Sequence, residues 1–207
     1  MNRVVPIALL SIALLAFATL LLVILPAIEI RDEPPSPGLE PYTEQEARGR
    51  AVYIAEGCVY CHTQQPRSSD QGPDAERGWG RPSVASDYAF DQPHLLGTMR
   101  SGPDLLNVGA RLPSAGWHLT HLYQPRAIFD WSLMPSYPYL FEIKKRAEPG
   151  DVVVSLPRAY RPTHGVVVAK PEATDLVAYI LSLDRNFPAP ANGIRDDGYA
   201  RKGGPKS

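Results

Sequence analysis

Two cysteines and a histidine form the motif with the clearest chemical meaning in this sequence. Cys58 and Cys61 are the only cysteines of the chain, and His62 follows the second one directly. A structural zinc site needs four ligands, and there is no second cysteine pair to supply them. A disulfide or a dithiol redox centre needs the two sulfurs but not the adjacent histidine. Covalent haem c uses the whole pattern, with two thioether bonds to the cofactor and an imidazole ligand for its iron, so we expect one haem c here.

An electron-transfer haem needs a second axial ligand, and a methionine thioether in that position raises the reduction potential. Apart from the initiator, the methionines are Met99 and Met134. Met134 is far enough along the chain to fold over the opposite face of the haem from His62, and we predict that it binds the iron. Either methionine could instead fill a gap in the core. The remaining candidates for this position are four histidines, His94, His118, His121 and His164.

Other residues are expected to support the cofactor. A metal-bound histidine usually donates its free ring N–H to a carbonyl, and Pro103 in "SGPDLLNVG" is the candidate acceptor, because a proline-held turn presents its carbonyl rigidly. Arginine suits carboxylates, which makes Arg111 and Arg126 candidate donors to the haem propionates. In "WHLTHLYQPR", His118 and His121 have a spacing that can hold a metal, but no carboxylate or cysteine lies nearby in sequence. We interpret them as a structural pair, hydrogen-bonded under the haem edge or to a partner subunit.

The composition indicates long loops, and local patterns predict the helices of a mainly helical domain. The 207 residues have a formal net charge of −1, so a nucleic-acid partner is not expected. The chain includes 22 prolines and 16 glycines, which are typical of loops. Thr43 and Glu46 form a capping box that opens a helix over 43–56. A second helix is predicted over 171–184, and Gly49 should let the two helices cross closely. The strand-like runs Val152–Val154 and Val166–Val168 predict one short hairpin. Residues 64–100 are predicted to form an ordered surface loop.

The N-terminal region predicts a membrane anchor. Residues 4–28 contain no charge, and as a helix of ~37 Å they would cross a hydrocarbon core of ~30 Å. A cleaved signal peptide, the alternative, would have a shorter apolar region and a clear cleavage site. Arg3 precedes the span and mostly acidic residues follow it, which favours a cytoplasmic N-terminus and a periplasmic domain. We expect an anchor (1–30), a proline-rich linker (31–42), a haem domain (43–186) and a flexible tail (187–207).

Four motifs in order resemble those of one family. The segments "EGCVYCHTQQ", "LLGTMRSGPDLLNVGAR", "WHLTHLYQPR" and "SLMPSYPYL" resemble the mono-haem cytochrome c subunit of cbb3-type cytochrome c oxidases, over roughly 44–141. The resemblance implies a class I cytochrome c-like domain behind a single transmembrane helix in the bacterial inner membrane. It also implies electron transfer towards a haem–copper catalytic subunit that reduces oxygen, with a further cytochrome c subunit or a soluble cytochrome c as donor. By the same matching, Cys58 and Cys61 would hold the haem, and His62 and Met134 would bind iron.

The sequence departs from that family in two places and leaves rival functions open. "QQPR" reverses the usual order after the twin glutamine, and residues 145–172 look extended where the family tends to carry a longer, helical, charged insertion. A free membrane-anchored electron shuttle, the haem c subunit of a nitric oxide reductase, and a haem enzyme or gas sensor with an open sixth position are the alternatives. The 64–100 loop and "WHLTHL" favour a permanent interface over a shuttle, which needs little beyond its haem edge.

Overall fold

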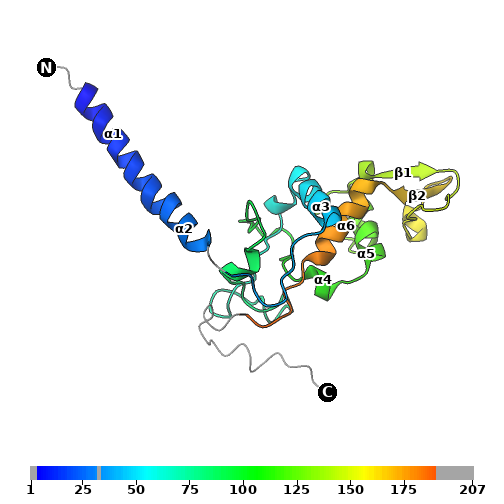
Figure 1. The fold of residues 1–207 in the computed structure, drawn as a ribbon. Coiled ribbons are helices and arrows are strands. Elements are labelled where there is room, and N and C mark those ends of the chain that lie inside the picture. The colour runs from blue at the N-terminus through cyan, green and yellow to red at the C-terminus, as the bar shows by residue number, and fades with distance from the viewer. Residues whose placement is uncertain (1–3, 32–33, 190–207) are drawn as a thin grey trace.

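The chain begins with a long apolar helix. The computed structural model describes residues 4–31 and 34–189. Helix α1 (Val4–Thr19) continues through a π-helical turn (Leu20–Ile24) into α2 (Leu25–Arg31), and this rod extends away from the rest of the chain (Figure 1). The span Val4–Glu29 is long and apolar enough to cross a membrane, and none of it is buried within the protein.

The π-helical turn lies just before Pro26. Proline lacks an N–H, and its ring clashes with the carbonyl four residues earlier in a regular helix. The N–H of Leu25 bonds instead to the carbonyl of Leu20, five residues back, which is the wider π pattern. The apolar helix predicted over 4–28 is therefore present, with one widened turn that accommodates the proline.

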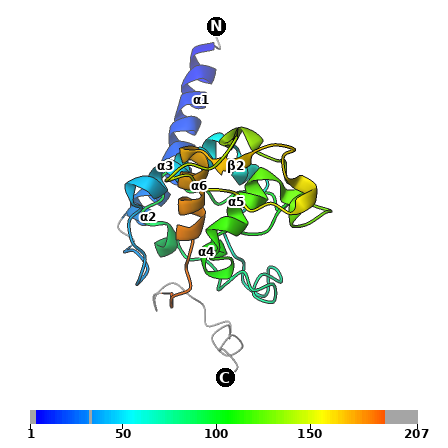
Figure 2. The ribbon, with the colours of Figure 1, turned by 90° about the vertical axis from the view of Figure 1, so that its right-hand side faces the viewer.

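Two crossed helices form the centre of the folded domain (Figure 2). Helix α3 (Glu44–Ala55) begins at Thr43, whose hydroxyl accepts from the Glu46 N–H while the Glu46 carboxylate accepts from the Thr43 N–H, so the predicted capping box is confirmed. Helix α6 (Pro171–Ser182) has its proline in the first turn, where the missing N–H costs nothing. The predicted helices differ from these by one or two residues at their ends.

Gly49 is where the two helices meet. A Cβ at this position would overlap the backbone carbonyl of Asp175, so the predicted crossing at Gly49 is confirmed. Arg48 extends from the same turn and makes an ion pair with the Asp175 carboxylate at 2.8 Å. Tyr53, one turn further along, is fully buried and packs edge-on against Tyr179 at 5.4 Å between ring centroids.

Shorter elements connect these helices. Helices α4 (Val108–Arg111) and α5 (Ala115–Tyr123) lie in the middle of the chain, and both contact α6. Five 3₁₀ turns occur in the described residues: Cys58–Tyr60, Ala85–Tyr88, Pro125–Ala127, Pro138–Leu140 and Arg158–Tyr160. The domain is mainly helical, as expected.

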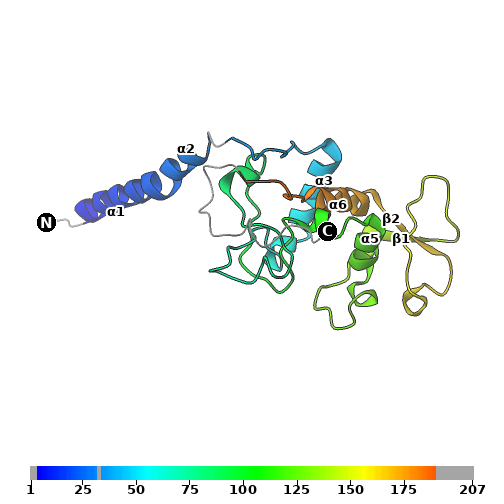
Figure 3. The ribbon, with the colours of Figure 1, turned by 90° about the horizontal axis from the view of Figure 1, so that it is seen from below.

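The predicted pairing of the two valine runs is confirmed in part, and one of them also pairs with a segment that was not predicted as a strand. Strand β2 (Val166–Ala169) pairs antiparallel with β1 (Phe141–Lys144), which the sequence analysis had not assigned to a strand (Figure 3). Val152–Val154 still runs beside β2, through a bridge between Val153 and Val168 and two backbone hydrogen bonds of 2.9 Å. Phe141 in β1 and Val154 are both buried in the core cluster, so both neighbours of β2 contribute to the core.

The linker and the start of the tail are both attached to the domain. Residues 34–43 contain no helix or strand, as predicted, but Ser36 is buried and donates to the Asp87 carboxylate at 2.8 Å. Of the expected tail over 187–207, only 187–189 belong to the described residues. The ring of Phe187 lies over Arg81, and a Cβ at Gly38 would be 3.2 Å from that ring.

The long 64–100 segment is ordered by buried charge rather than by regular structure. Asp74 and Asp87 are both inaccessible to solvent, and each pairs with an arginine, Asp74 with Arg100 at 2.7 Å and Asp87 with Arg81 at 2.6 Å. Tyr88 donates to the Gln64 carbonyl at 2.7 Å. An ordered loop was predicted here, and the ion pairs that order it were not.

Candidate haem-binding site

The cysteine motif follows directly after helix α3. Gly57 has a φ of 70°, in the left-handed region that glycine adopts readily, and it turns the chain out of the helix. A 3₁₀ turn over Cys58–Tyr60 follows, and the His62 N–H bonds to the Cys58 carbonyl at 3.0 Å. The turn therefore holds the two cysteines and the histidine on one compact segment.

The two thiols are not joined to each other. Cys58 and Cys61 are free cysteines, the first half-buried and the second exposed. Burial, and then the charge of Glu56, raises the pKa of the Cys58 thiol to about 12. A redox-active dithiol needs a lowered pKa, because the thiolate is the reactive form. The environment of Cys58 thus argues against a dithiol redox centre.

The imidazole of His62 is held from behind by a backbone carbonyl. Its Nδ1 lies 2.8 Å from the carbonyl oxygen of Pro103, the contact that the sequence predicted. A Cβ on Gly102 would overlap the His62 ring, so only glycine lets the Pro103 turn approach this closely. Burial lowers the pKa of His62, which favours the neutral imidazole. With Nδ1 bonded to a carbonyl, Nε2 is the nitrogen that can bind a metal.

The two methionines have different surroundings. Met134 is half-buried and packs against the core cluster, as do Cys58, Val59 and Leu105. Met99 is 60% exposed. A side chain that binds a buried cofactor must itself be sheltered, and of the two methionines Met134 meets that requirement.

The histidine candidates divide in the same way. His94 and His164 are exposed. His118 is buried, and its Nε2 lies 2.8 Å from the Leu112 carbonyl, so its partner is a backbone carbonyl of the chain, where a bond under the haem edge or to a partner subunit was predicted. His121 stacks on Trp117 at 4.8 Å between ring centroids. The described residues contain no group of three or more metal-binding side chains from His, Cys, Asp and Glu.

The two candidate arginines are placed differently. Arg111 donates from Nη2 to the Asp104 carbonyl at 2.6 Å, while its Nε is buried without a partner among the described residues. Burial lowers the pKa of Arg111. Arg126 is exposed, and the contact at this residue is its backbone carbonyl, which accepts from the Tyr160 hydroxyl at 3.1 Å.

The sequence matches one known family over most of its length. The match covers residues 2–161 and is to the family described as cytochrome c oxidase, mono-haem subunit/FixO. The chain belongs to this family. Comparison with curated proteins gave no match. The matched range extends beyond the four motifs to the apolar N-terminal helix and to β1, and the mainly helical domain is consistent with the cytochrome c-like fold of such a subunit.

A mono-haem oxidase subunit must hold one haem, and the residues around His62 fit this cofactor. Haem is a large apolar disc with two carboxylates, so it requires both apolar neighbours and hydrogen-bond donors. The half-buried side chains of Cys58, Val59, Leu105 and Met134 all pack against the same apolar core cluster. The described residues also hold three buried polar side-chain atoms with no partner, which are Tyr53 Oη, Arg111 Nε and His121 Nδ1. Buried polar atoms are normally paired, and a bound haem would offer such partners.

Two features that we had assigned to an interface instead have partners within the chain. In "WHLTHL", His118, Leu119 and Thr120 are buried, and Thr120 donates to the Ser155 carbonyl at 3.1 Å. In the 64–100 segment, Tyr88 is buried and the aspartates are paired. The stretch before Met134 does carry exposed apolar side chains: Phe129 (41%), Trp131 (75%) and Leu133 (82%).

Proposed function

We propose that this chain is the membrane-anchored electron-transfer subunit of a cbb3-type cytochrome c oxidase, and that it carries one covalent haem c. The observation that carries the proposal is the hydrogen bond between His62 Nδ1 and the Pro103 carbonyl. It fixes the ring with Nε2 available, on the turn that also contains Cys58 and Cys61. Zinc would need further ligands, and the described residues contain no group of three or more His, Cys, Asp and Glu side chains, while a dithiol centre does not need the histidine.

The roles of the site residues follow from their chemistry. Haem c supplies a one-electron carrier when it is bound. Cys58 and Cys61 would form the thioether bonds, His62 and Met134 would bind the iron on its two faces, and Pro103 would orient His62. Pro135 restricts the backbone next to Met134 and supports the ligand loop. Arg111 Nε would donate to a propionate, and Arg126 would act only at the exposed rim.

The test of attachment is the double variant Cys58→Ala with Cys61→Ala. It should lose covalent haem, and its domain should fail to fold, because the loops around the motif bury little apolar surface of their own. Denaturing gels stained for haem peroxidase activity measure the attachment. Haem staining that persists in the double variant would contradict the proposal.

The proposed location is the bacterial inner membrane, with the domain on the periplasmic side. The apolar helix Val4–Glu29 supports the anchor, and covalent haem c attachment outside the cytoplasm supports the orientation. We expect the mature protein to begin at or near Met1 and to remain in membranes washed with carbonate. A soluble product that begins after Ala27, identified by mass spectrometry, would show a cleaved signal peptide instead.

The proposed partners are the haem–copper catalytic subunit and a cytochrome c that delivers electrons. Membership of an oxidase subunit family supports a complex. Phe129, Trp131 and Leu133 form an apolar exposed stretch that a fixed partner would cover. Purification of the full chain in mild detergent should recover a stoichiometric haem–copper subunit with oxygen-reducing activity. Recovery of the chain alone would favour a free shuttle, and recovery with a nitric oxide reductase would change the acceptor.

A further inference from the structure

Two segments of the chain are tied together directly behind His62. The first is 61–65, which contains the histidine, and the second is 100–106, which contains Pro103. Their backbones are joined by hydrogen bonds from the Gly102 N–H to the Cys61 carbonyl at 2.9 Å and from the Leu105 N–H to the Thr63 carbonyl at 2.8 Å. The carbonyl that accepts from His62 therefore lies between two fixed points.

Asp104, the residue after Pro103, adds side-chain bonds to this junction. Its carboxylate is inaccessible to solvent. Oδ2 accepts from the Thr63 hydroxyl at 2.6 Å and from the Gln65 N–H at 2.7 Å, and Oδ1 accepts from the Leu106 N–H at 2.9 Å. Burial raises the pKa of Asp104, while these three hydrogen bonds and the charge of Arg100 oppose the rise.

Arg100 completes the arrangement from the other side. Its Nε donates to Thr63 Oγ1 at 2.8 Å, its Nη1 to Asp74 Oδ1 at 2.7 Å, and its Nη2 to the Gln65 carbonyl at 2.7 Å. Nη2 also lies 3.6 Å from Asp104 Oδ2. Asp74 is itself fully buried and accepts from the Arg67 N–H at 2.7 Å. We call Thr63, Asp74, Arg100 and Asp104 the Arg100 cluster.

The cluster holds one positive and two negative charges in a site with little access to water. Two fully buried carboxylates around one arginine are costly to desolvate, and an apolar packing of the same loop would avoid that cost. A network of this kind fixes its members in one geometry when all of them are satisfied. Two of its members are direct sequence neighbours of the pair: Thr63 follows His62, and Asp104 follows Pro103.

We propose that Asp104 and Arg100 are positioning residues for His62, which hold the Pro103 carbonyl against Nδ1 and thereby set the reduction potential of the haem. This inference rests on the proposed function, since it takes His62 as an iron ligand. A firmly held acceptor at Nδ1 makes the imidazole a stronger electron donor to the metal. A more basic ligand stabilises ferric iron, so an intact cluster lowers the potential and a weakened one raises it.

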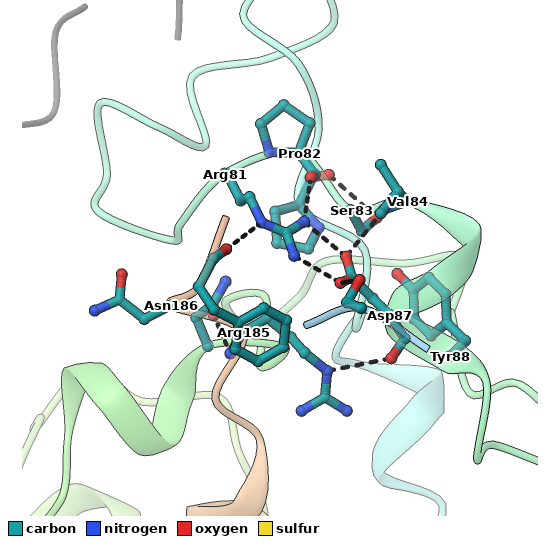
Figure 4. A network of polar contacts seen from close by, with 12 residues as sticks. Arg81, Pro82, Ser83, Val84, Asp87, Tyr88, Arg185 and Asn186 are labelled. Atoms are coloured by element: carbon teal, nitrogen blue, oxygen red, sulfur yellow. Dashed lines mark hydrogen bonds and ion pairs between the residues drawn. The ribbon is translucent and has the colours of Figure 1, made fainter. Parts of the chain in front are cut away.

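A second buried pair in the same loop provides a matched control. Arg81 donates from Nη1 and Nη2 to both oxygens of the Asp87 carboxylate, at 2.7 and 2.6 Å, and Figure 4 shows the pair with its neighbours. Arg81 also donates from Nε to the Phe187 carbonyl at 2.8 Å, and the Asp87 carbonyl accepts from Arg185 at 3.2 Å. These contacts join the loop to the end of the chain that follows α6, and none of them involves His62 or Pro103. Loss of this pair should therefore cost stability without a change at the iron.

The experiment compares full-length holoprotein in detergent with Asp104→Asn, Thr63→Val and Asp87→Asn. Potentials are measured by spectroelectrochemical titration at pH 8, and the ferric electron paramagnetic resonance spectrum is recorded beside each. Asp104→Asn should raise the ratio of reduced to oxidised haem at the wild-type midpoint by roughly threefold, about 28 mV at about 59 mV per tenfold change. Thr63→Val breaks the link without altering charge and should shift the potential in the same direction, with altered ferric g-values. Asp87→Asn should lower the melting temperature with potential and g-values unchanged.

The outcomes separate this inference from the proposed function. A wild-type chain without covalent haem, or without a histidine–methionine spectrum, would contradict the proposed function. A normal wild-type spectrum with unshifted potentials in both Asp104→Asn and Thr63→Val would overturn the positioning role alone. A shift in Asp104→Asn without one in Thr63→Val would also overturn it, because the effect would then be that of the lost charge. Equal shifts in Asp104→Asn and Asp87→Asn would point to general loosening and overturn it as well. If Asp104→Asn does not retain haem, Thr63→Val decides.

Discussion

The backbone of Gly49 in α3 lies against the carbonyl of Asp175 in α6, with no room for a side chain between them. This contact sets the distance between the two helices that carry most of the core. It also places the end of α3, and therefore the cysteine motif that follows, relative to α6.

Gly49→Ala should accordingly destabilise the domain. Its methyl group would meet backbone rather than a movable side chain, so the helices must separate, at a cost of about 1–3 kcal/mol. The measurement is the thermal melting of the holoprotein in detergent. Gly116→Ala is the control, because the nearest atom to a Cβ there is Ser114 Oγ at 4.0 Å. That variant should raise stability by up to about 1 kcal/mol, since alanine is the better helix former.

The main helices and the motif could be predicted because their signals are local. The capping box at Thr43 and Glu46 and the proline at the start of α6 act within a single turn, and both helices formed within two residues of the expected ends. The acceptor for His62 could be predicted as well, because a proline-held turn in a glycine-containing segment restricts the choices. Gly102 then allows the close approach that the contact needs.

The parts that could not be predicted depend on contacts between distant residues. Strand β2 pairs with Phe141–Lys144 and is also bridged to Val152–Val154, and the valine pattern predicted only the second of these neighbours. The buried aspartates of the 64–100 loop look like surface residues in the sequence. Asp74 lies 26 positions from Arg100, and only the folded chain brings them together. The signal in the sequence that could have indicated the buried cluster was Asp104, because it directly follows Pro103, whose carbonyl accepts from His62.

Arg111 and Arg126 were both predicted as propionate donors, but substitutions at the two positions should have different effects. Arg111→Gln removes a positive charge and a buried, unpartnered donor, so it should lower the reduction potential and weaken haem retention. Arg126→Gln, at an exposed position, should change neither beyond the error of the measurement. Both are read from the haem content per protein and a redox titration. Equal effects from the two variants would contradict the assignment of Arg111 as a propionate donor.

Stability should fall as the pH decreases below 6.5, in part because of His118. Burial lowers the pKa of His118; the charge of Arg111 lowers it further, and the hydrogen bond to the Leu112 carbonyl opposes this change. Burial lowers the pKa of His121 to about 4. The folded protein keeps these rings neutral while the unfolded chain takes up protons. Above the unfolded pKa, neither ring lowers the free energy of unfolding. Below it, each ring lowers the free energy of unfolding by up to about 1.4 kcal/mol per pH unit.

The variant His118→Gln isolates one of these two contributions. Its amide can still donate to the Leu112 carbonyl but cannot be protonated in this range. The melting temperature of the wild type should drop more steeply between pH 7 and pH 5 than that of the variant. Parallel pH profiles for the two proteins would show that His118 does not titrate between the folded and unfolded states.

Replacement of the sixth ligand distinguishes an electron carrier from a haem that binds gases. Met134→Leu keeps an apolar side chain of similar size against the core and removes the sulfur. The variant should lose the weak far-red absorption band of sulfur bound to ferric iron, because that band requires the thioether. It should also lower the reduction potential, since a methionine ligand raises it, and let carbon monoxide bind the reduced haem. Met99→Leu is the matched control at an exposed position and should leave all three properties unchanged.

If the wild type already binds carbon monoxide readily, the sixth position is open and the carrier function is wrong. If Met99→Leu produces these changes instead, the carrier function stands and the ligand is Met99.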